Sequence, residues 1–162
     1  MRRSGLKGLT LGLFVFAAGL VGSASAHAHL AASEPADRAV VAEVPAQLEL
    51  TFSEAVETGI SRFYVYRLDT ELPDLEEGPA ERDWQRINAQ AGMLVNEVLG
   101  GAENEDLQVD ADLANVPSRS EQVSLVLEED LGPGIYFAFW RVLSIDTHIT
   151  EGFVTFIVAN GR

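Results

Sequence analysis

Alternation of apolar and polar residues is the feature that most limits how this chain can fold. In QLELTFS (47–53) it places Leu48, Leu50 and Phe52 on one side, and VSLVLEE (123–129) repeats the pattern. Successive side chains of a β-strand point to opposite faces, so this period of two is typical of a half-buried strand. We expect both segments to lie in a sheet with one face against the core.

Three further segments are richer in aromatic and β-branched residues, as central strands of a packed sandwich are. They are SRFYVYRL (61–68), GIYFAFWRV (134–142) and GFVTFIV (152–158), and the turn LGPG precedes the second. Several short strands separated by turn signals indicate an all-β fold. We predict an immunoglobulin-like Greek-key β-sandwich or barrel of about seven antiparallel strands.

Between about residues 69 and 120 the strand pattern gives way to an acidic stretch with one helical island. Its apolar residues recur at spacings of three and four: Trp84, Ile87, Ala91, Leu94, Val95, Val98 and Leu99. This period predicts a helix from about Ala80 to Leu99, ended by Gly100 and Gly101. We expect it to pack on one face or end of the sandwich, because its polar face lacks the basic stripe of a membrane-surface helix.

The first 26 residues have the pattern of a secretory signal peptide. Arg2, Arg3 and Lys7 precede the apolar run LTLGLFVFAAGLVG, and ASA follows it, which predicts cleavage after Ala26. The run is shorter than the roughly 20 residues that a spanning helix needs. We therefore predict one exported, periplasmic domain over residues 27–162 that is not an integral membrane protein. Cleavage after Ala28 also satisfies the small-x-small rule.

The predicted domain is strongly acidic. Loss of the leader, which carries three positive charges and no acid, lowers the formal charge from −14 to −17, with no lysine left. Nucleic acid is therefore not expected as a partner, whereas a cation or a basic protein surface fits the charge. The acids are scattered and clustered in loops, and a surface that keeps the protein soluble accounts for most of this charge. The chain has no cysteine, which excludes disulfides and thiolate ligands.

The chain has only three histidines, and their positions suggest a metal site. Cleavage after Ala26 makes His27 the first residue, so its amine and its ring can chelate one ion together. His148 stands two residues after Asp146, and in an extended segment such residues share one side. The alternatives are a solvated tail at His27 and a turn in which Asp146 caps backbone amides.

Four segments together resemble the CopC/PcoC family of periplasmic copper-resistance proteins. They are HAHLAASEPAD, LELTFSE, PGIYFAFWRVLSIDTH and GFVTFIV, in the family's order. The resemblance covers both ends of the predicted domain but not its helical middle, which is then an insertion at about 69–120. It implies a seven-stranded Greek-key fold that binds Cu(II) at one end and acts in copper homeostasis and resistance.

The resemblance also implies a ligand set. His27 matches the family's N-terminal histidine, which binds through amine and ring, and Asp146 and His148 match its Asp-x-His ligands. Glu54 matches an acidic residue near the site, for which we expect an orienting role. These nitrogen and oxygen donors suit one tetragonal Cu(II) ion. His29 is a nearby group or an alternative ligand, because a free N-terminus with histidine at position three also chelates Cu(II).

The sequence departs from the family pattern at two places. Met93 is the only methionine after the leader, and we place it on the apolar stripe of the helix, so no methionine-rich Cu(I) site is expected. Ile149 stands where the family often has proline.

Three functional hypotheses follow. The first is a non-enzymatic Cu(II) carrier or buffer that delivers to an inner-membrane copper transporter. The second is a copper-dependent oxidative enzyme with an N-terminal histidine chelate; it is disfavoured because the aromatic residues are expected in the core and Asp146 occupies a coordination position. The third is a metal-free immunoglobulin-like interaction domain, which makes the placement of all three histidines a coincidence.

Overall fold

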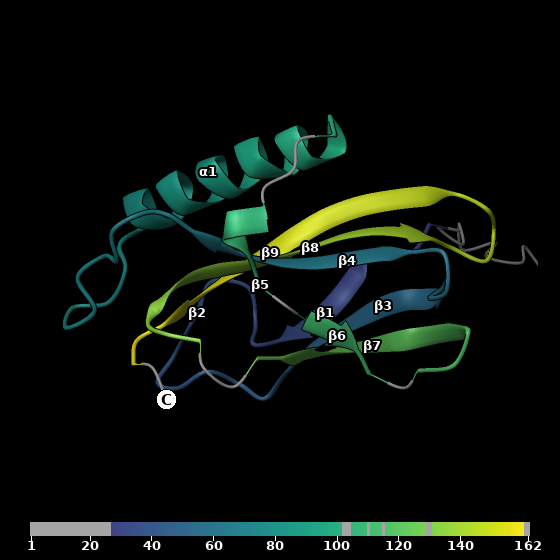
Figure 1. Ribbon diagram of the computed structural model, residues 1–162, viewed down its shortest axis with the longest axis horizontal. Helices are drawn as coiled ribbons and strands as arrows, with labels where there is room; N and C mark the ends of the chain where they lie inside the picture. The colour runs from purple at the N-terminus through teal and green to yellow at the C-terminus, as the bar shows by residue number, and fades with distance from the viewer. Residues whose placement is uncertain (1–26, 102–104, 110, 115, 129–130, 161–162) are drawn as a thin grey trace, which may run out of the picture.

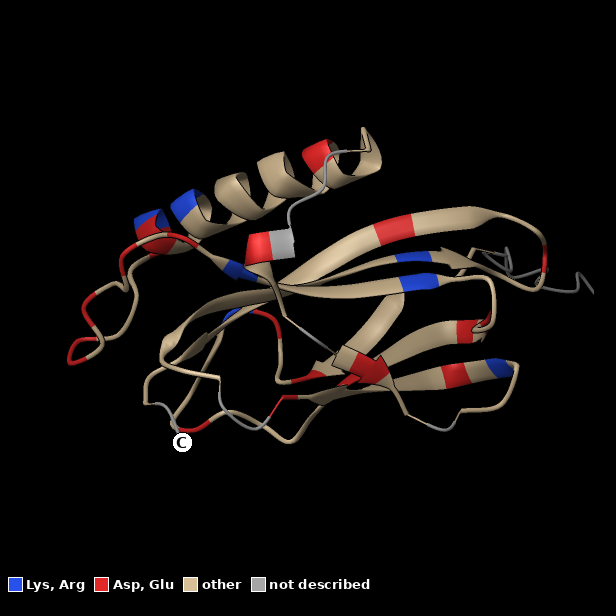
Figure 2. Ribbon diagram, in the orientation of Figure 1, with Lys and Arg blue, Asp and Glu red and all other residues tan. Residues whose placement is uncertain are grey.

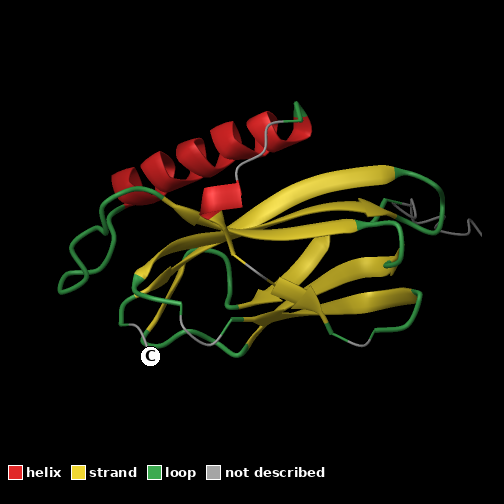
Figure 3. Ribbon diagram, in the orientation of Figure 1, coloured by secondary structure: helices red, strands yellow, loops and turns green. Residues whose placement is uncertain are grey.

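Two stacked β-sheets with a helix on one outer face make up the fold (Figure 1 and Figure 3). The computed structural model describes residues 27–101, 105–109, 111–114, 116–128 and 131–160, and the predicted signal peptide lies outside them. Within these residues no helix is long and apolar enough to cross a membrane.

The two sheets contain nine strands among the described residues. The four-stranded sheet has the order β1 (Leu30–Glu34), β3 (Gln47–Glu57), β7 (Arg119–Leu127), β6 (Ala111–Leu113). The five-stranded sheet has the order β2 (Ala39–Val41), β9 (Ile149–Val158), β8 (Gly134–Leu143), β4 (Arg62–Leu68), β5 (Gln108–Val109). The predicted all-β sandwich is confirmed. The sheets contain more than the roughly seven strands predicted, because β5 and β6 form within the segment where the strand pattern lapses. Strand β2 pairs with β9 in parallel, whereas antiparallel strands were predicted.

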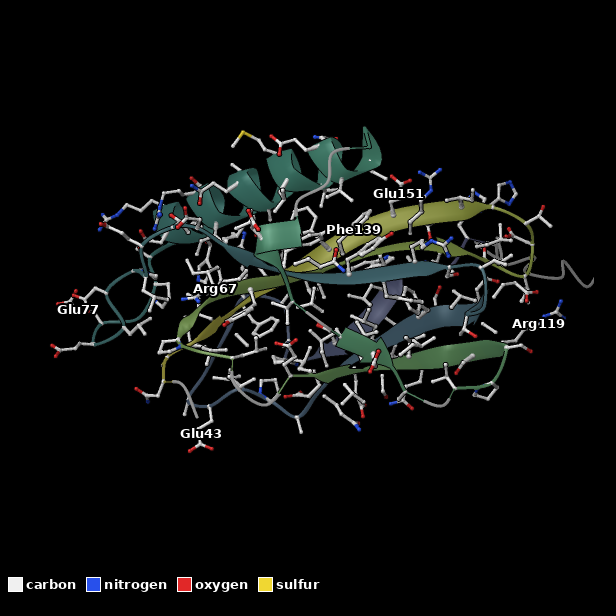
Figure 4. The ribbon with its side chains drawn as sticks, viewed as in Figure 1. Glu43, Arg67, Glu77, Arg119, Phe139 and Glu151 are labelled. Carbon is white, nitrogen blue, oxygen red and sulfur yellow. The ribbon has the colours of Figure 1, made fainter. Side chains whose placement is uncertain are left out.

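The core between the sheets follows the alternation of the sequence. Leu48, Leu50 and Phe52 of β3 are at most 2% exposed, and the alternating residues of β7 are also buried. Strand β8 is buried on both faces. Tyr136, Ala138, Trp140 and Val142 enter the core between the sheets, whereas Ile135, Phe137 and Phe139 lie on the helix side. Figure 4 labels Phe139 between the sheet and the helix.

Helix α1 (Glu81–Leu99) covers part of the outer face of the five-stranded sheet, and the 3-10 turn η1 (Glu105–Leu107) follows it. Its buried side chains are Trp84, Ile87, Ala91 and Leu94, four of the seven on the predicted stripe. Val95 and Val98 are partly buried, whereas Leu99 in the last turn is 37% exposed. The placement of Met93 on this stripe is wrong, since its side chain is 61% exposed. At about 100° per residue, Met93 lies some 200° around the helix from Ala91 and faces outward.

The hairpin β8–β9 positions the candidate site. Its ladder runs from Gly134 and Val158 to Leu143 and Ile149, so the connecting residues 144–148 form a tip at the end of the sandwich away from the C-terminus (Figure 1). Strand β1 pairs antiparallel with β3, with Leu30 opposite Phe52. The residues before β1 therefore lie at the same end as the tip.

Gly152 should be sensitive to substitution, because a Cβ atom there would lie 2.5 Å from Cζ2 of the buried Trp140. We expect Gly152→Ala to lower the free energy of unfolding by about 1–3 kcal/mol, the usual cost of overpacking a core. Denaturant unfolding checks this. Gly92→Ala on α1 is the matched control, because nothing lies within 4 Å of a Cβ there. Equal losses in the two variants would contradict the packing argument.

Candidate metal site

The hairpin tip is a tight turn closed by Ser144. The backbone N–H of Ser144 donates to the carbonyl of His148 at 2.9 Å, and the N–H of Thr147 donates to the carbonyl of Ser144 at 2.9 Å. Thr147 has φ 72°, a left-handed conformation that a β-branched residue rarely adopts. Strain of this kind is concentrated at functional sites, where the surrounding structure maintains it.

This turn brings Asp146 and His148 together. Nδ1 of His148 lies 2.8 Å from Oδ2 of Asp146, and the backbone N–H of His148 donates to Oδ1 at 3.1 Å. The hydroxyl of Ser144 donates to the same Oδ1 at 2.6 Å. The two side chains thus converge as expected from their spacing, but through a turn and not through an extended segment.

The carboxylate of Asp146 is held in its ionised form. The hydroxyl of Ser144 is the largest cause and keeps the pKa of Asp146 well below its ordinary value. Partial burial acts in the opposite direction, and the backbone N–H and ring of His148 lower the pKa further. The carboxylate is therefore ready to accept a cation over the whole physiological pH range.

Three contacts hold the N-terminal segment against the tip. Ala28 is fully buried in the core between the sheets, and the hydroxyl of Thr150 donates to its carbonyl at 2.6 Å. The N–H of Ser53 donates to the carbonyl of His29 at 2.8 Å. These contacts at Ala28 and His29 fix where the preceding His27 lies.

His27 completes a cluster of three potential ligands. Its Nδ1 lies 3.4 Å from Oδ2 of Asp146, and its ring centroid is 4.3 Å from that of His148. One ligand atom from each of His27, Asp146 and His148 lies within 4.8 Å of the other two. Both rings are more than half exposed, so an ion can approach from solvent.

The other two candidate residues are placed differently. The ring of His29 is outside the cluster, since its Nδ1 lies 3.1 Å from Oγ of Ser53 and 3.1 Å from the carbonyl oxygen of His27. Glu54 on β3 is also outside the cluster. Its Oε1 is buried and has no hydrogen-bond partner among the described residues.

The supporting residues Ser144, Ser53 and Thr150 did not follow from the sequence reasoning. Ser144 had a usable signal, because it stands two residues before Asp146, within reach of its carboxylate. Ser53 and Thr150 had none, because their contacts are made with residues far away along the chain.

Comparison with known proteins gives a consistent family. A family model described as the CopC domain matches residues 30–159. Among curated proteins, YobA of Escherichia coli (strain K12) is 31% identical over 133 residues, which is 82% of this chain and 79% of YobA. YobA of Shigella flexneri matches to the same extent.

Solved structures show the same fold. PcoC, a methionine-rich copper resistance protein from Escherichia coli, superposes with a TM-score of 0.53 at 23% identity, covering 82% of this chain and 99% of PcoC. CopC from Methylosinus trichosporium OB3b superposes with a TM-score of 0.55 at 20% identity, covering 84% of this chain and 96% of CopC.

Proposed function

Because the chain belongs to the CopC domain family, we propose that it is a periplasmic Cu(II)-binding protein that carries or buffers copper in homeostasis and resistance. The observation that carries the proposal is the cluster of His27, Asp146 and His148 at the hairpin tip. The copper resistance named for PcoC supports the same role.

The donor set fits one Cu(II) ion. The rings of His27 and His148 supply nitrogen and Asp146 supplies an anionic oxygen, a combination that suits tetragonal Cu(II) and places copper first among divalent ions. Signal-peptide cleavage after Ala26 adds the α-amine of His27 as a further nitrogen. The buried, unpartnered Oε1 of Glu54 supports an orienting role toward this amine, because such an oxygen is costly without a donor.

The site is suited to the oxidised ion. PcoC is named as methionine-rich, whereas this chain has two methionines, of which Met1 belongs to the predicted leader and Met93 lies on the outer face of α1. A thioether site for Cu(I) is therefore not part of the proposal. The delivery target that we propose is an inner-membrane copper transporter.

A carrier is favoured over an oxidative enzyme by where the aromatic side chains lie. Among the described residues, Tyr66, Phe137, Phe139 and Trp140 are buried and Tyr64 is partly exposed, which is too little for a flat polysaccharide-binding surface. Carrying copper requires no turnover chemistry. A metal-free interaction domain would leave the gathering of His27, Asp146 and His148 at one point without a role.

The direct test is the intact mass of the exported protein, followed by Cu(II) titration with EPR on the same sample. We expect a chain that begins at His27 and binds one tetragonal, nitrogen-rich Cu(II). A correctly processed chain without a specific Cu(II) signal would overturn the proposal, and so would a thermal unfolding temperature unchanged by Cu(II), because an ion that binds the folded state raises stability.

Cu(II) affinity should fall on acidification because the nitrogen ligands take up protons. Free imidazoles and α-amines have pKa values of about 6.5 and 7.7–8.0, so we expect a loss of at least about tenfold between pH 7.5 and 5.5. Asp146 does not contribute to this loss, because its pKa is lowered and its carboxylate stays ionised. Competition titrations at several pH values measure the effect, and a flat profile would contradict the nitrogen ligands.

A further inference from the structure

A shallow depression lies next to the metal cluster on the outer face of the five-stranded sheet, beyond the part that α1 covers. Its volume is about 290 Å³, and Ile60, Arg62, Arg141, Val142, Leu143 and Ile149 line it. We call Ile60, Arg62, Arg141, Leu143 and Ile149 the tip patch. Ile149 directly follows His148, so the patch and the metal cluster share the hairpin tip.

The apolar part of the tip patch is unusually exposed. Three of the chain's six isoleucines, Ile87, Ile135 and Ile157, are fully buried. The other three are all at the metal-binding end: Ile60 is 63% exposed, Ile149 55%, and Ile145, within the tip, 52%. Exposed apolar side chains gathered at one place, with polar residues around them, mark a contact surface.

The charge of the tip patch is opposite to that of the chain. Arg62 on β4 lies directly opposite Arg141 on β8, and of these two only Arg141 has an ion pair within the described residues, with Glu151 at 3.2 Å. Figure 2 shows these basic positions side by side on neighbouring β4 and β8. Nearby Glu57 is itself paired with Arg119 at 2.6 Å. The patch thus keeps a positive charge on a chain of net charge −14.

The ion pair with Glu151 compensates Arg141 only, and Arg62 has no ion pair among the described residues. Like charges directly opposite one another on neighbouring strands destabilise a sheet. A residue pattern that violates a local rule is expected where function requires it. A partner that places a carboxylate between Arg62 and Arg141 would remove the repulsion.

We propose that the tip patch is the docking surface for the protein that exchanges copper with the site. The partner presents an apolar side chain to the isoleucines, flanked by carboxylates that meet Arg62 and Arg141. This inference rests on the proposed copper function. It adds a route by which the ion reaches or leaves the site, because a partner that contacts Ile149 lies beside the proposed ligand His148.

The test places a photo-crosslinking amino acid at Ile60 in the full chain, exported in its own cells, and identifies the adduct by peptide mass spectrometry. We expect an adduct with another protein, on a segment that carries carboxylates. Arg62→Glu should reduce the yield about tenfold, because it sets like charges face to face at the contact. Arg82→Glu, an equal charge change at the far end of the molecule on α1, should leave the yield unchanged.

Arg62→Glu should fold at least as well as the original chain, since it places opposite charges across β4 and β8. No adduct, a yield unaffected by Arg62→Glu, an adduct on a segment without carboxylates, or one between two copies of this chain would each overturn the docking surface. Cu(II) titration of the same proteins separates the two proposals. If the original chain does not bind Cu(II), the copper function is refuted. If Arg62→Glu binds Cu(II) normally, its reduced crosslinking yield is due to weaker docking.

Discussion

Replacing His148 by alanine should weaken Cu(II) binding by about a hundredfold or more. Loss of an outer-shell partner of a metal ligand already costs about 10–100-fold in affinity, and His148 is proposed as a ligand itself. The fold should be retained, because the ring is 60% exposed and only the backbone of His148 closes the turn. Competition titration measures the affinity, and EPR should show the loss of one nitrogen donor.

His29→Ala is the matched control. It removes another exposed imidazole from the same end of the molecule, but one whose ring contacts Ser53 and the backbone carbonyl of His27 and is not among the three clustered side chains. We expect a small change in affinity and an unaltered spectrum. The reverse result, a silent His148→Ala and a damaging His29→Ala, would assign the ion to an N-terminal chelate through the third residue.

Acetylation of the amino terminus should also weaken Cu(II) binding. After the predicted cleavage the α-amine of His27 is the only primary amine, because Lys7 is the only lysine and lies in the leader. An amine-selective reagent therefore modifies one position. An acetylated amine can no longer donate its lone pair, so we expect Cu(II) affinity to fall about tenfold to a hundredfold, the range for a damaged metal site.

The mass gain of one acetyl group confirms the modification, and unfolding curves without metal show whether the fold is intact. Acetylated protein that keeps its affinity and spectrum would remove the α-amine from the ligand set. It would leave the two rings and Asp146 as the site.

Most of the sandwich could be predicted from local pattern. The alternation at Leu48, Leu50 and Phe52 specifies a buried face whatever the partner strand is, and the spacing of Trp84, Ile87 and Ala91 specifies a helix in the same way. Strands β5 and β6 could not be predicted, because two- and three-residue strands are too short to carry a pattern and form only where a neighbour supplies the hydrogen bonds.

Only part of the candidate site could be predicted from local sequence patterns. The spacing of Asp146 and His148 is local, and so is their convergence. The approach of His27 depends on burial of Ala28 and on the contact from Thr150, more than a hundred residues away. The family resemblance, and not the spacing of residues, predicts that His27 joins Asp146 and His148. The predicted position of Met93 is wrong because apolar character alone does not imply burial, and the angle of Met93 around the helix points its side chain to solvent.

The distance along the chain between His27 and the hairpin tip has a consequence for the proposed copper site. If the chain is exported and cleaved as proposed, an unfolded chain would carry the N-terminal chelate and the Asp-x-His pair as two separate weak binders. Only the docking of β1 on β3 and closure of the β8–β9 hairpin bring them to one point. Occupancy of the complete site would therefore report that folding is finished, and newly exported, immature chains would hold copper too loosely to compete with mature ones.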